Sequence, residues 1–217
     1  RGVPLARVRA ELAVAVTGEP ALRTALVTGA SRGIGLAVAR LLASSGVRVA
    51  LVARSANELS ARAAAIGGAA LAVPADVTIE SEVARAVAAV RDAFGDVPDL
   101  LVNNAGIFVP KPLHVLTAEE FERTVQVNLV APFLVLRAVL PRWRELGRGH
   151  AITLGSIADR TTFPDNGAYS ASKFGARAVH EVLRAETKGT GIRATLIAPS
   201  STNTSIWDTL ELPANNR

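Results

Sequence analysis

Short runs of apolar and β-branched residues alternate, from Leu22 onward, with longer stretches whose apolar residues recur at helical spacing. Strands are expected near residues 24–28, 47–53, 69–74, 100–103, 151–155 and 193–198, and helices near 35–42, 56–65, 83–94, 121–143 and 171–185. Thr117 and Glu120, ahead of the fourth helix, have capping-box spacing. This alternation predicts an α/β fold, a doubly wound parallel sheet of the Rossmann-like type in a three-layer αβα arrangement.

A glycine-rich turn directly follows the first expected strand and opens a helix. It contains Gly29, Ser31, Arg32, Gly33, Ile34 and Gly35. Glycines in this context let backbone amides approach a pyrophosphate at the positive end of a helix. We therefore expect a dinucleotide site here, the alternative being that the glycines only allow a tight turn and close helix packing.

The second expected strand ends at Ala53 and is followed by Arg54. Sites that prefer NAD usually have an acidic residue at this place, which binds the ribose 2′-hydroxyl. Arg54 and Arg32 are suited instead to a 2′-phosphate, through forked, charge-assisted hydrogen bonds. The sequence thus favours NADP(H), while either arginine alone is equally consistent with a solvated surface side chain.

Three further motifs follow in order: Asn103-Asn104-Ala105-Gly106, Ser156, and Tyr169-Ser170-Ala171-Ser172-Lys173. With the glycine turn, they make residues 22–207 resemble the short-chain dehydrogenase/reductase family. The resemblance implies a catalytic tetrad of Asn128, Ser156, Tyr169 and Lys173. It also implies cofactor contacts from Asp76, Val77, Asn104, Ala105, Gly106, Tyr169, Lys173, Pro199 and Thr204.

The residue types fit carbonyl chemistry. Hydride transfer to a carbonyl leaves negative charge on oxygen, so the site must supply a proton and hydrogen-bond donors. Tyr169 can supply the proton, although the ordinary pKa of a phenol is about 10. Lys173 lies four residues later on the same helix face, where its ammonium is expected to lower the pKa of that phenol. Ser156 is expected to donate to the substrate oxygen, or else to cap a strand end.

Pro132 lies four residues after Asn128 and has no amide hydrogen to donate to the Asn128 carbonyl. We expect this carbonyl to lack its ordinary helical partner and to hold a water that links Lys173 to solvent. The alternative role for Asn128 is a side-chain hydrogen bond to the backbone.

Composition narrows the function further. The formal charge of +5 comes from arginines and lysines that never form a run, so we expect no nucleic-acid partner. Cysteine is absent, and His114, His150 and His180 are isolated, so no metal site is expected. The most apolar stretch, residues 129–140, is too short to cross a membrane. A cytoplasmic location is the expectation.

The chain departs from the family pattern near its end, where Ser200 replaces the usual glycine and predicts an altered turn. Residues 1–21 are expected to form a leader or short extension, and 22–217 a single dinucleotide-binding catalytic domain. The family's last helix and seventh strand are not expected before Arg217, so we expect the natural protein to continue. Trp207 lies where a substrate lid would begin and either lines the pocket or packs against the fold.

The sequence therefore predicts an NADP(H)-dependent oxidoreductase that moves a hydride between nicotinamide and a small carbonyl or alcohol substrate, with 3-oxoacyl reduction among the possibilities. The long helices around Phe121 and Ala171 resemble the family's dimer surfaces, which predicts a homo-oligomer, a dimer or tetramer. One alternative is an NADP-binding regulatory or scaffold protein without turnover. Sugar-nucleotide epimerisation is another, but it needs a longer chain with a substrate domain.

Overall fold

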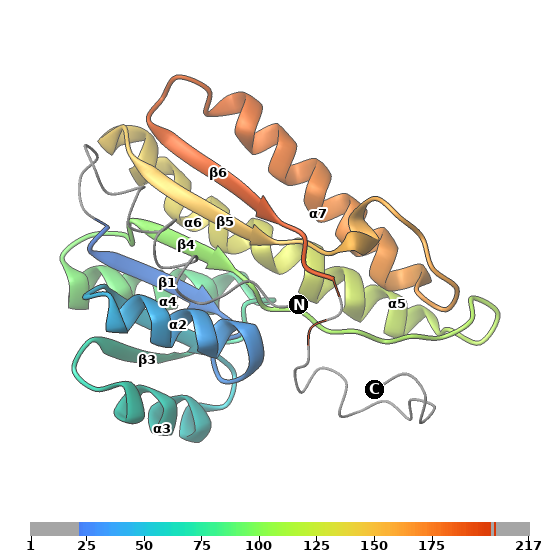
Figure 1. The fold of residues 1–217 in the computed structure, drawn as a ribbon, viewed down its shortest axis with the longest axis horizontal. Helices are drawn as coiled ribbons and strands as arrows, with labels where there is room; N and C mark the ends of the chain where they lie inside the picture. The colour runs from blue at the N-terminus through green and yellow to red at the C-terminus, as the bar shows by residue number, and fades with distance from the viewer. Residues whose placement is uncertain (1–21, 201, 203–217) are drawn as a thin grey trace.

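Six parallel strands form the centre of the structure, a computed structural model that describes residues 22–200 and 202. They are β1 (Thr24–Thr28), β2 (Arg48–Ala53), β3 (Ala70–Pro74), β4 (Leu100–Asn103), β5 (Gly149–Leu154) and β6 (Ile192–Ile197). The strand order is β3-β2-β1-β4-β5-β6, so the first strand lies mid-sheet, and the strands that follow extend the sheet to one edge and then to the other (Figure 1). This order confirms the predicted doubly wound, Rossmann-like fold.

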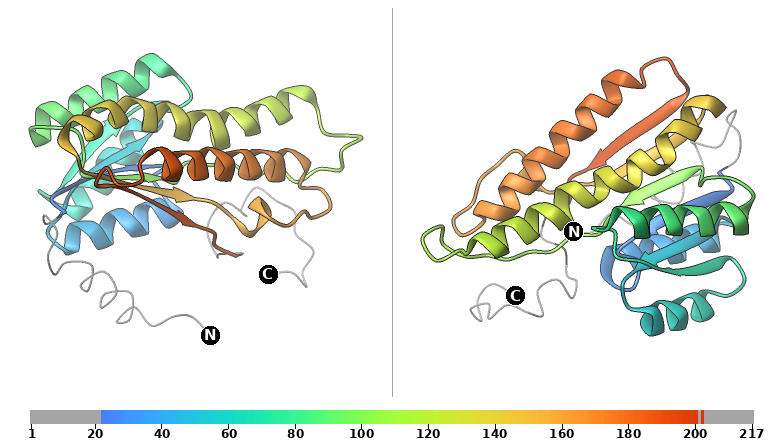
Figure 2. Two further views of the ribbon diagram at one scale, coloured as in Figure 1. Left: turned by 90° about the horizontal axis from the view of Figure 1, so that it is seen from above. Right: turned by 180° about the vertical axis from the view of Figure 1, so that it is seen from behind.

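Helices connect the strands and cover both faces of the sheet (Figure 2). They are α2 (Gly33–Ser44), α3 (Ala56–Ile66), α4 (Glu80–Phe94), α5 (Ala118–Val125), α6 (Ala131–Leu146) and α7 (Gly167–Glu186). Side chains alternate between the faces along each strand. In β1, Ala25 and Val27 belong to the apolar cluster under α2 and α3, whereas Leu26 belongs to the cluster under α4 and α6. Every expected strand and helix is present, with ends that differ by a few residues.

The fourth helix differs from the prediction, because it is not one continuous α-helix. A π-helical turn, η1 (Gln126–Val130), separates α5 from α6. Pro132 cannot donate to the Asn128 carbonyl, so the ordinary hydrogen-bond ladder cannot run through this point. The bonding shifts by one residue, and the Ala131 amide donates to the Gln126 carbonyl. The expected capping box at the start of α5 is present, with Glu120 N donating to Thr117 Oγ1 at 3.2 Å.

Within the described residues, the stretch Ala118–Leu146 is the only one long and apolar enough to cross a membrane by length and composition. A core helix of a soluble protein passes the same test. Here Val135, Val139 and Trp143 of α6 are buried in the apolar cluster on the sheet, and the Trp143 indole donates to the Pro98 carbonyl at 2.7 Å. The predicted division at residue 21 lies outside the described residues and stays a prediction.

Candidate active site

A cleft of about 1240 Å³ opens where the carboxyl ends of the central strands meet, the place where doubly wound sheets bind ligands. Most of the residues predicted for the site line it: Gly29, Ser31, Arg32, Gly33, Ile34, Arg54, Asp76, Val77, Asn104, Ala105, Gly106, Ser156, Tyr169, Lys173 and Pro199. Gly35 and Asn128 lie behind its wall, both buried. Thr204 and Trp207 lie outside the described residues.

The glycine turn forms one wall of the cleft. Gly29 and Gly33 have φ values of 63° and 56°. Residues with a Cβ seldom adopt such values. The N-cap of α2 makes no side-chain hydrogen bond, and its first turn has no acidic residue. The first amides of α2 are thus left for a ligand, whereas α5 satisfies its own with a capping box. An anion such as a pyrophosphate fits this helix end.

A second turn, after β4, is fixed against the glycine turn. The Asn104 side chain donates to the Thr28 carbonyl at 2.8 Å, and the amides of Asn104 and Ala105 both donate to Thr28 Oγ1 at 3.0 Å. The Asn104 turn therefore supports the wall of the cleft. The sequence did not predict a role for Thr28. Its only signal is its position, directly before Gly29 at the end of β1.

Charged groups gather at the end of the cleft beside β2 and β3. Arg32, Arg54 and Glu58 line it, and Glu58 is paired with Arg62 at 3.5 Å. Arg62 also donates to the Ser31 carbonyl at 3.2 Å, a contact that spacing along the chain did not predict. Because Glu58 has its own cation, the guanidinium groups of Arg32 and Arg54 are the cations at this end that could pair with a phosphate.

Asp76 follows β3 in the same region. Partial burial raises the pKa of its carboxyl, but hydrogen bonds from the Thr78 hydroxyl and amide, together with the Arg54 charge, hold it below its ordinary value. The two hydrogen bonds measure 2.7 and 2.9 Å. Asp76 is therefore ionised at neutral pH and anchored at the edge of the cleft.

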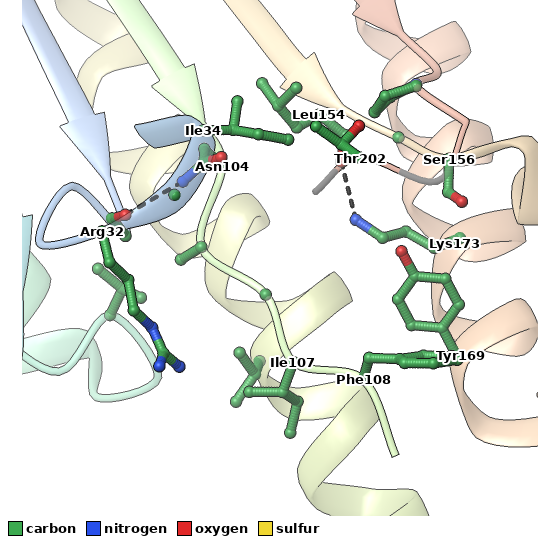
Figure 3. Close-up of a pocket in the computed structure, with 18 of the residues that line it drawn as sticks. Arg32, Ile34, Asn104, Ile107, Phe108, Leu154, Ser156, Tyr169, Lys173 and Thr202 are labelled. Carbon is green, nitrogen blue, oxygen red and sulfur yellow. Dashed lines mark hydrogen bonds between the residues drawn. The ribbon is translucent and has the colours of Figure 1, made fainter. Parts of the chain in front are cut away.

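The proposed proton-transfer residues come together at the other end. Tyr169 and Lys173 lie on α7, and Figure 3 shows the Tyr169 hydroxyl turned toward the Lys173 amine. Lys173 Nζ lies 5.7 Å from the centre of the Tyr169 ring. Ser156, just after β5, lies beside Tyr169 and lowers the pKa of its phenol, and the Ser156 hydroxyl accepts from the Ala158 amide at 3.1 Å. The predicted Ser156, Tyr169 and Lys173 thus share one site, and Ser156 also caps the 3₁₀ turn that follows it, rather than the end of a strand.

The expected lowering of the Tyr169 pKa is not what the structure shows. Burial raises the pKa of the Tyr169 phenol, the Ser156 hydrogen bond lowers it, and the nearby charge of Asp159 raises it, with a net rise. Burial also lowers the pKa of Lys173 to about 8, against a smaller rise caused by Asp159. The amine donates to the Leu154 carbonyl at 2.8 Å rather than to the phenol. Sequence spacing placed both groups on one face but could not show how deeply they are buried.

Asn128 has a different place from the other three. Its Nδ2 donates to the Ile107 carbonyl at 2.9 Å and to Ser172 Oγ at 3.1 Å, and its Oδ1 accepts from the Ile107 amide at 2.8 Å. The side chain thus fixes the segment after β4 against α7, the backbone-bonding role left open as the alternative. The water on its carbonyl stays a prediction.

Two features of the site have no strong sequence signal. Phe108 packs edge-on against Tyr169, with ring centroids 4.9 Å apart and an interplanar angle of 76°. Ser200 does not have a positive φ, since Asp165 is the only such non-glycine residue in the described part of the chain. The turn at Ser200 thus takes a conformation that serine tolerates, and the predicted difference from the family's turn stays a prediction.

Known proteins are similar to this chain in sequence and in fold. The sequence profile of the short chain dehydrogenase family matches residues 23–214. D-threitol dehydrogenase of Mycolicibacterium smegmatis is 37% identical over 193 residues, which cover 86% of this chain and 74% of that protein. Another curated relative, 38% identical, is far longer, and the chain spans 15% of it.

Two solved structures are also similar to this chain in sequence and in fold. A metagenomic short-chain oxidoreductase in complex with NADP is 39% identical with a TM-score of 0.77, over 83% of each chain. A 3-ketoacyl-(acyl-carrier-protein) reductase from Brucella melitensis, complexed with NADH, is 34% identical with a TM-score of 0.83, over 87% of this chain and 79% of that one.

Proposed function

The chain belongs to the short-chain dehydrogenase/reductase family, and from that premise we propose that it is an NADP(H)-dependent oxidoreductase acting on a carbonyl or alcohol. Tyr169 is its proton donor and acceptor. The observation that carries this proposal is the convergence of Tyr169, Lys173 and Ser156 on one end of a cleft whose other end is an uncapped helix terminus.

The cleft fits a phosphorylated dinucleotide. The α2 terminus and the glycine turn would hold the pyrophosphate, Asp76 and Val77 would lie along the adenine, and Arg32 and Arg54 would pair with a 2′-phosphate. When bound, the cofactor supplies or accepts the hydride. The two related structures described above contain NADP in one case and NADH in the other, so the preference for NADP(H) rests on the two arginines.

Proton transfer is the work of the chain's own residues. Because its pKa is raised, Tyr169 is protonated at neutral pH, so its hydroxyl is ready to protonate the oxygen that becomes negative during carbonyl reduction. The Ser156 hydroxyl lies beside it and can donate a hydrogen bond to the same oxygen. Alcohol oxidation needs the phenolate and is therefore expected to accelerate as the pH rises.

The substrate is proposed to be a small or medium organic carbonyl or alcohol, because Phe108, Ile157 and Phe163 give the Tyr169 end of the cleft an apolar lining. A homo-oligomer is also proposed. Large apolar side chains stand exposed along α5, α6 and α7, namely Phe121, Phe133, Phe174 and Val182, and such a surface is typical of a subunit interface.

The test is to mix the protein with NADPH and a panel of ketones and aldehydes, following the loss of NADPH absorbance. Tyr169→Phe is the control, in which we expect turnover to fall about 10²- to 10⁴-fold. NADPH binding, measured separately by titration, should survive in that variant. Binding of NADPH without turnover of any carbonyl in the panel, with the variant behaving identically, would support a regulatory protein instead.

A further inference from the structure

Arg62 makes two contacts at the end of the cleft where a 2′-phosphate is proposed to bind. Its Nε donates to the Ser31 carbonyl at 3.2 Å, and its Nη2 lies 3.5 Å from Glu58 Oε1. Ser31 and Glu58 both line the cleft, whereas Arg62 is not among the lining residues. Any effect of Arg62 on a bound cofactor therefore passes through the residues that it contacts.

The packing of α3 fixes the position of this arginine. Leu59 and Ala63 are the buried residues of the helix, and they directly follow Glu58 and Arg62. Because residues four apart share a helix face, Glu58 and Arg62 lie together on the flank beside the buried face. Replacing either of them leaves the buried residues of α3 in place, so we expect variants at both positions to fold.

Glu58 is a negative charge at the end of the cleft that is proposed for a phosphate. It lines this end together with Arg54 and Ser55, and it lies in the first turn of α3. An unpaired carboxylate in such a place repels a 2′-phosphate and suits a ribose 2′-hydroxyl. The guanidinium of Arg62 offsets this charge, which leaves the cleft open to a phosphate.

The hydrogen bond to Ser31 links α3 to the glycine turn. The Ser31 carbonyl and the Arg32 amide belong to one planar peptide unit, so a contact that holds the carbonyl also orients the start of Arg32. Figure 3 shows the Arg32 side chain far from Tyr169, at the other end of the site. Arg62 thus acts on a proposed phosphate ligand, Arg32, and on the acid that would oppose the phosphate, Glu58.

We propose that Arg62 is a positioning residue that determines cofactor specificity: it neutralises Glu58 and holds the Ser31–Arg32 peptide, so that the cleft accepts a 2′-phosphate. This inference rests on the proposed function, because it requires that the cleft bind an adenine dinucleotide. The side chains of Arg62 and Glu58 are 41% and 38% exposed, so solvent screens their pair. The expected effect is therefore a change in affinity of a few-fold rather than a complete loss.

The test compares NADPH and NADH binding to the wild type and to Arg62→Gln, followed by nicotinamide fluorescence in the absence of substrate. We expect Arg62→Gln to weaken NADPH binding about fivefold, the upper effect of one exposed ion pair, and NADH binding less than about twofold. Adenosine 2′,5′-bisphosphate and adenosine 5′-monophosphate differ only in the 2′-phosphate. Competition by these two compounds should show the same difference.

A second variant separates the charge of Arg62 from a general structural role. Glu58→Gln removes the carboxylate that Arg62 offsets, and on its own it should bind NADPH at least as tightly as the wild type. Combined with Arg62→Gln, it should restore most of the lost NADPH affinity, which a merely structural arginine would not allow. Arg184→Gln is the matched control, because Arg184 belongs to an exposed ion pair with Glu181 on α7 and should not affect either cofactor.

The proposal is overturned if Arg62→Gln weakens NADPH and NADH binding equally, if it weakens neither, or if Glu58→Gln restores no NADPH affinity. Circular dichroism confirms that each variant is folded, and Arg62→Met gives the same comparison should Arg62→Gln fail to fold. A wild type that binds neither NADPH nor NADH would contradict the proposed function itself. Equal NADPH binding by the wild type and Arg62→Gln would contradict only the role of Arg62.

Discussion

Lys173 Nζ donates a hydrogen bond of 2.8 Å to the backbone carbonyl of Leu154, the last residue of β5. The amine is thus tied to the sheet and deeply buried, 6% exposed, and burial lowers its pKa to about 8 from an ordinary value of 10.5. A buried ammonium costs folding free energy that a neutral amine does not.

This cost predicts a specific dependence of stability on pH. Between about pH 8 and 10.5 the unfolded chain holds a proton on Lys173 that the folded chain has released, so the folded state gains stability as the pH rises through this window. The gap between the two pKa values corresponds to about 3 kcal/mol. We expect the free energy of unfolding of the wild type, relative to Lys173→Met, to increase by up to that amount across the window. Denaturant unfolding at several pH values measures it, and a constant difference would contradict the buried ammonium.

The glycine turn makes a second prediction. A Cβ on Gly35 would clash with the Gly29 carbonyl and lie 2.5 Å from Asn104 Nδ2, and a backbone atom cannot swing aside. Gly35→Ala should therefore destabilise the fold by about 1–3 kcal/mol and weaken NADPH binding. Gly68→Ala is the matched control, because a Cβ there meets no atom within 4 Å. Thermal unfolding and NADPH titration of both variants check this, and equal behaviour would rule out the close packing.

The expectations that succeeded were those set by local periodicity and turn chemistry. β1 and β4 were placed correctly because buried parallel strands are short apolar runs, and Thr117 capped α5 as its spacing with Glu120 indicated. The motifs at Gly29 and Tyr169 could be assigned to one cleft because parallel strands end at the same edge of a sheet.

The expectations that failed depended on burial and on contacts between distant segments. The missing amide of Pro132 was visible in the sequence, but a helical period alone did not show that the hydrogen bonding there shifts into the π-helical turn η1. The direction in which the Tyr169 pKa shifts depends on burial and on Asp159, ten residues away along the chain. No helical or strand period brings those two residues together, and the same holds for Phe108 against Tyr169.

Arg54 predicts how the protein chooses its cofactor. It lines the cleft beside Arg32 and its charge reaches Asp76, where a 2′-phosphate would add an anion. We expect Arg54→Gln to weaken NADPH binding about tenfold, the effect of one lost charged hydrogen bond, and to leave NADH binding nearly unchanged. Arg184→Gln, on the exposed side of α7 and paired with Glu181, is the control. An equal loss of affinity for NADPH and NADH would show that Arg54 does not bind the 2′-phosphate.

The last prediction concerns Asn128, because both the oxygen and the nitrogen of its side-chain amide form hydrogen bonds. Its Oδ1 accepts from the Ile107 amide, and its Nδ2 donates to the Ile107 carbonyl and to Ser172. Asn128→Asp would set a carboxylate oxygen against that carbonyl in a site only 2% exposed. We expect a loss of about 2–4 kcal/mol in the free energy of unfolding.

The same change should reach the reaction through Phe108, which follows Ile107 and packs against Tyr169. Once the Ile107 segment is released, we expect turnover to fall while the enzyme remains folded below its reduced melting temperature. Asn57→Asp, exposed in the first turn of α3, is the matched control and should stay within about 0.5 kcal/mol of the wild type. If Asn128→Asp is as stable as that control, the buried amide does not hold the Ile107 segment, because a carboxylate cannot replace its donor.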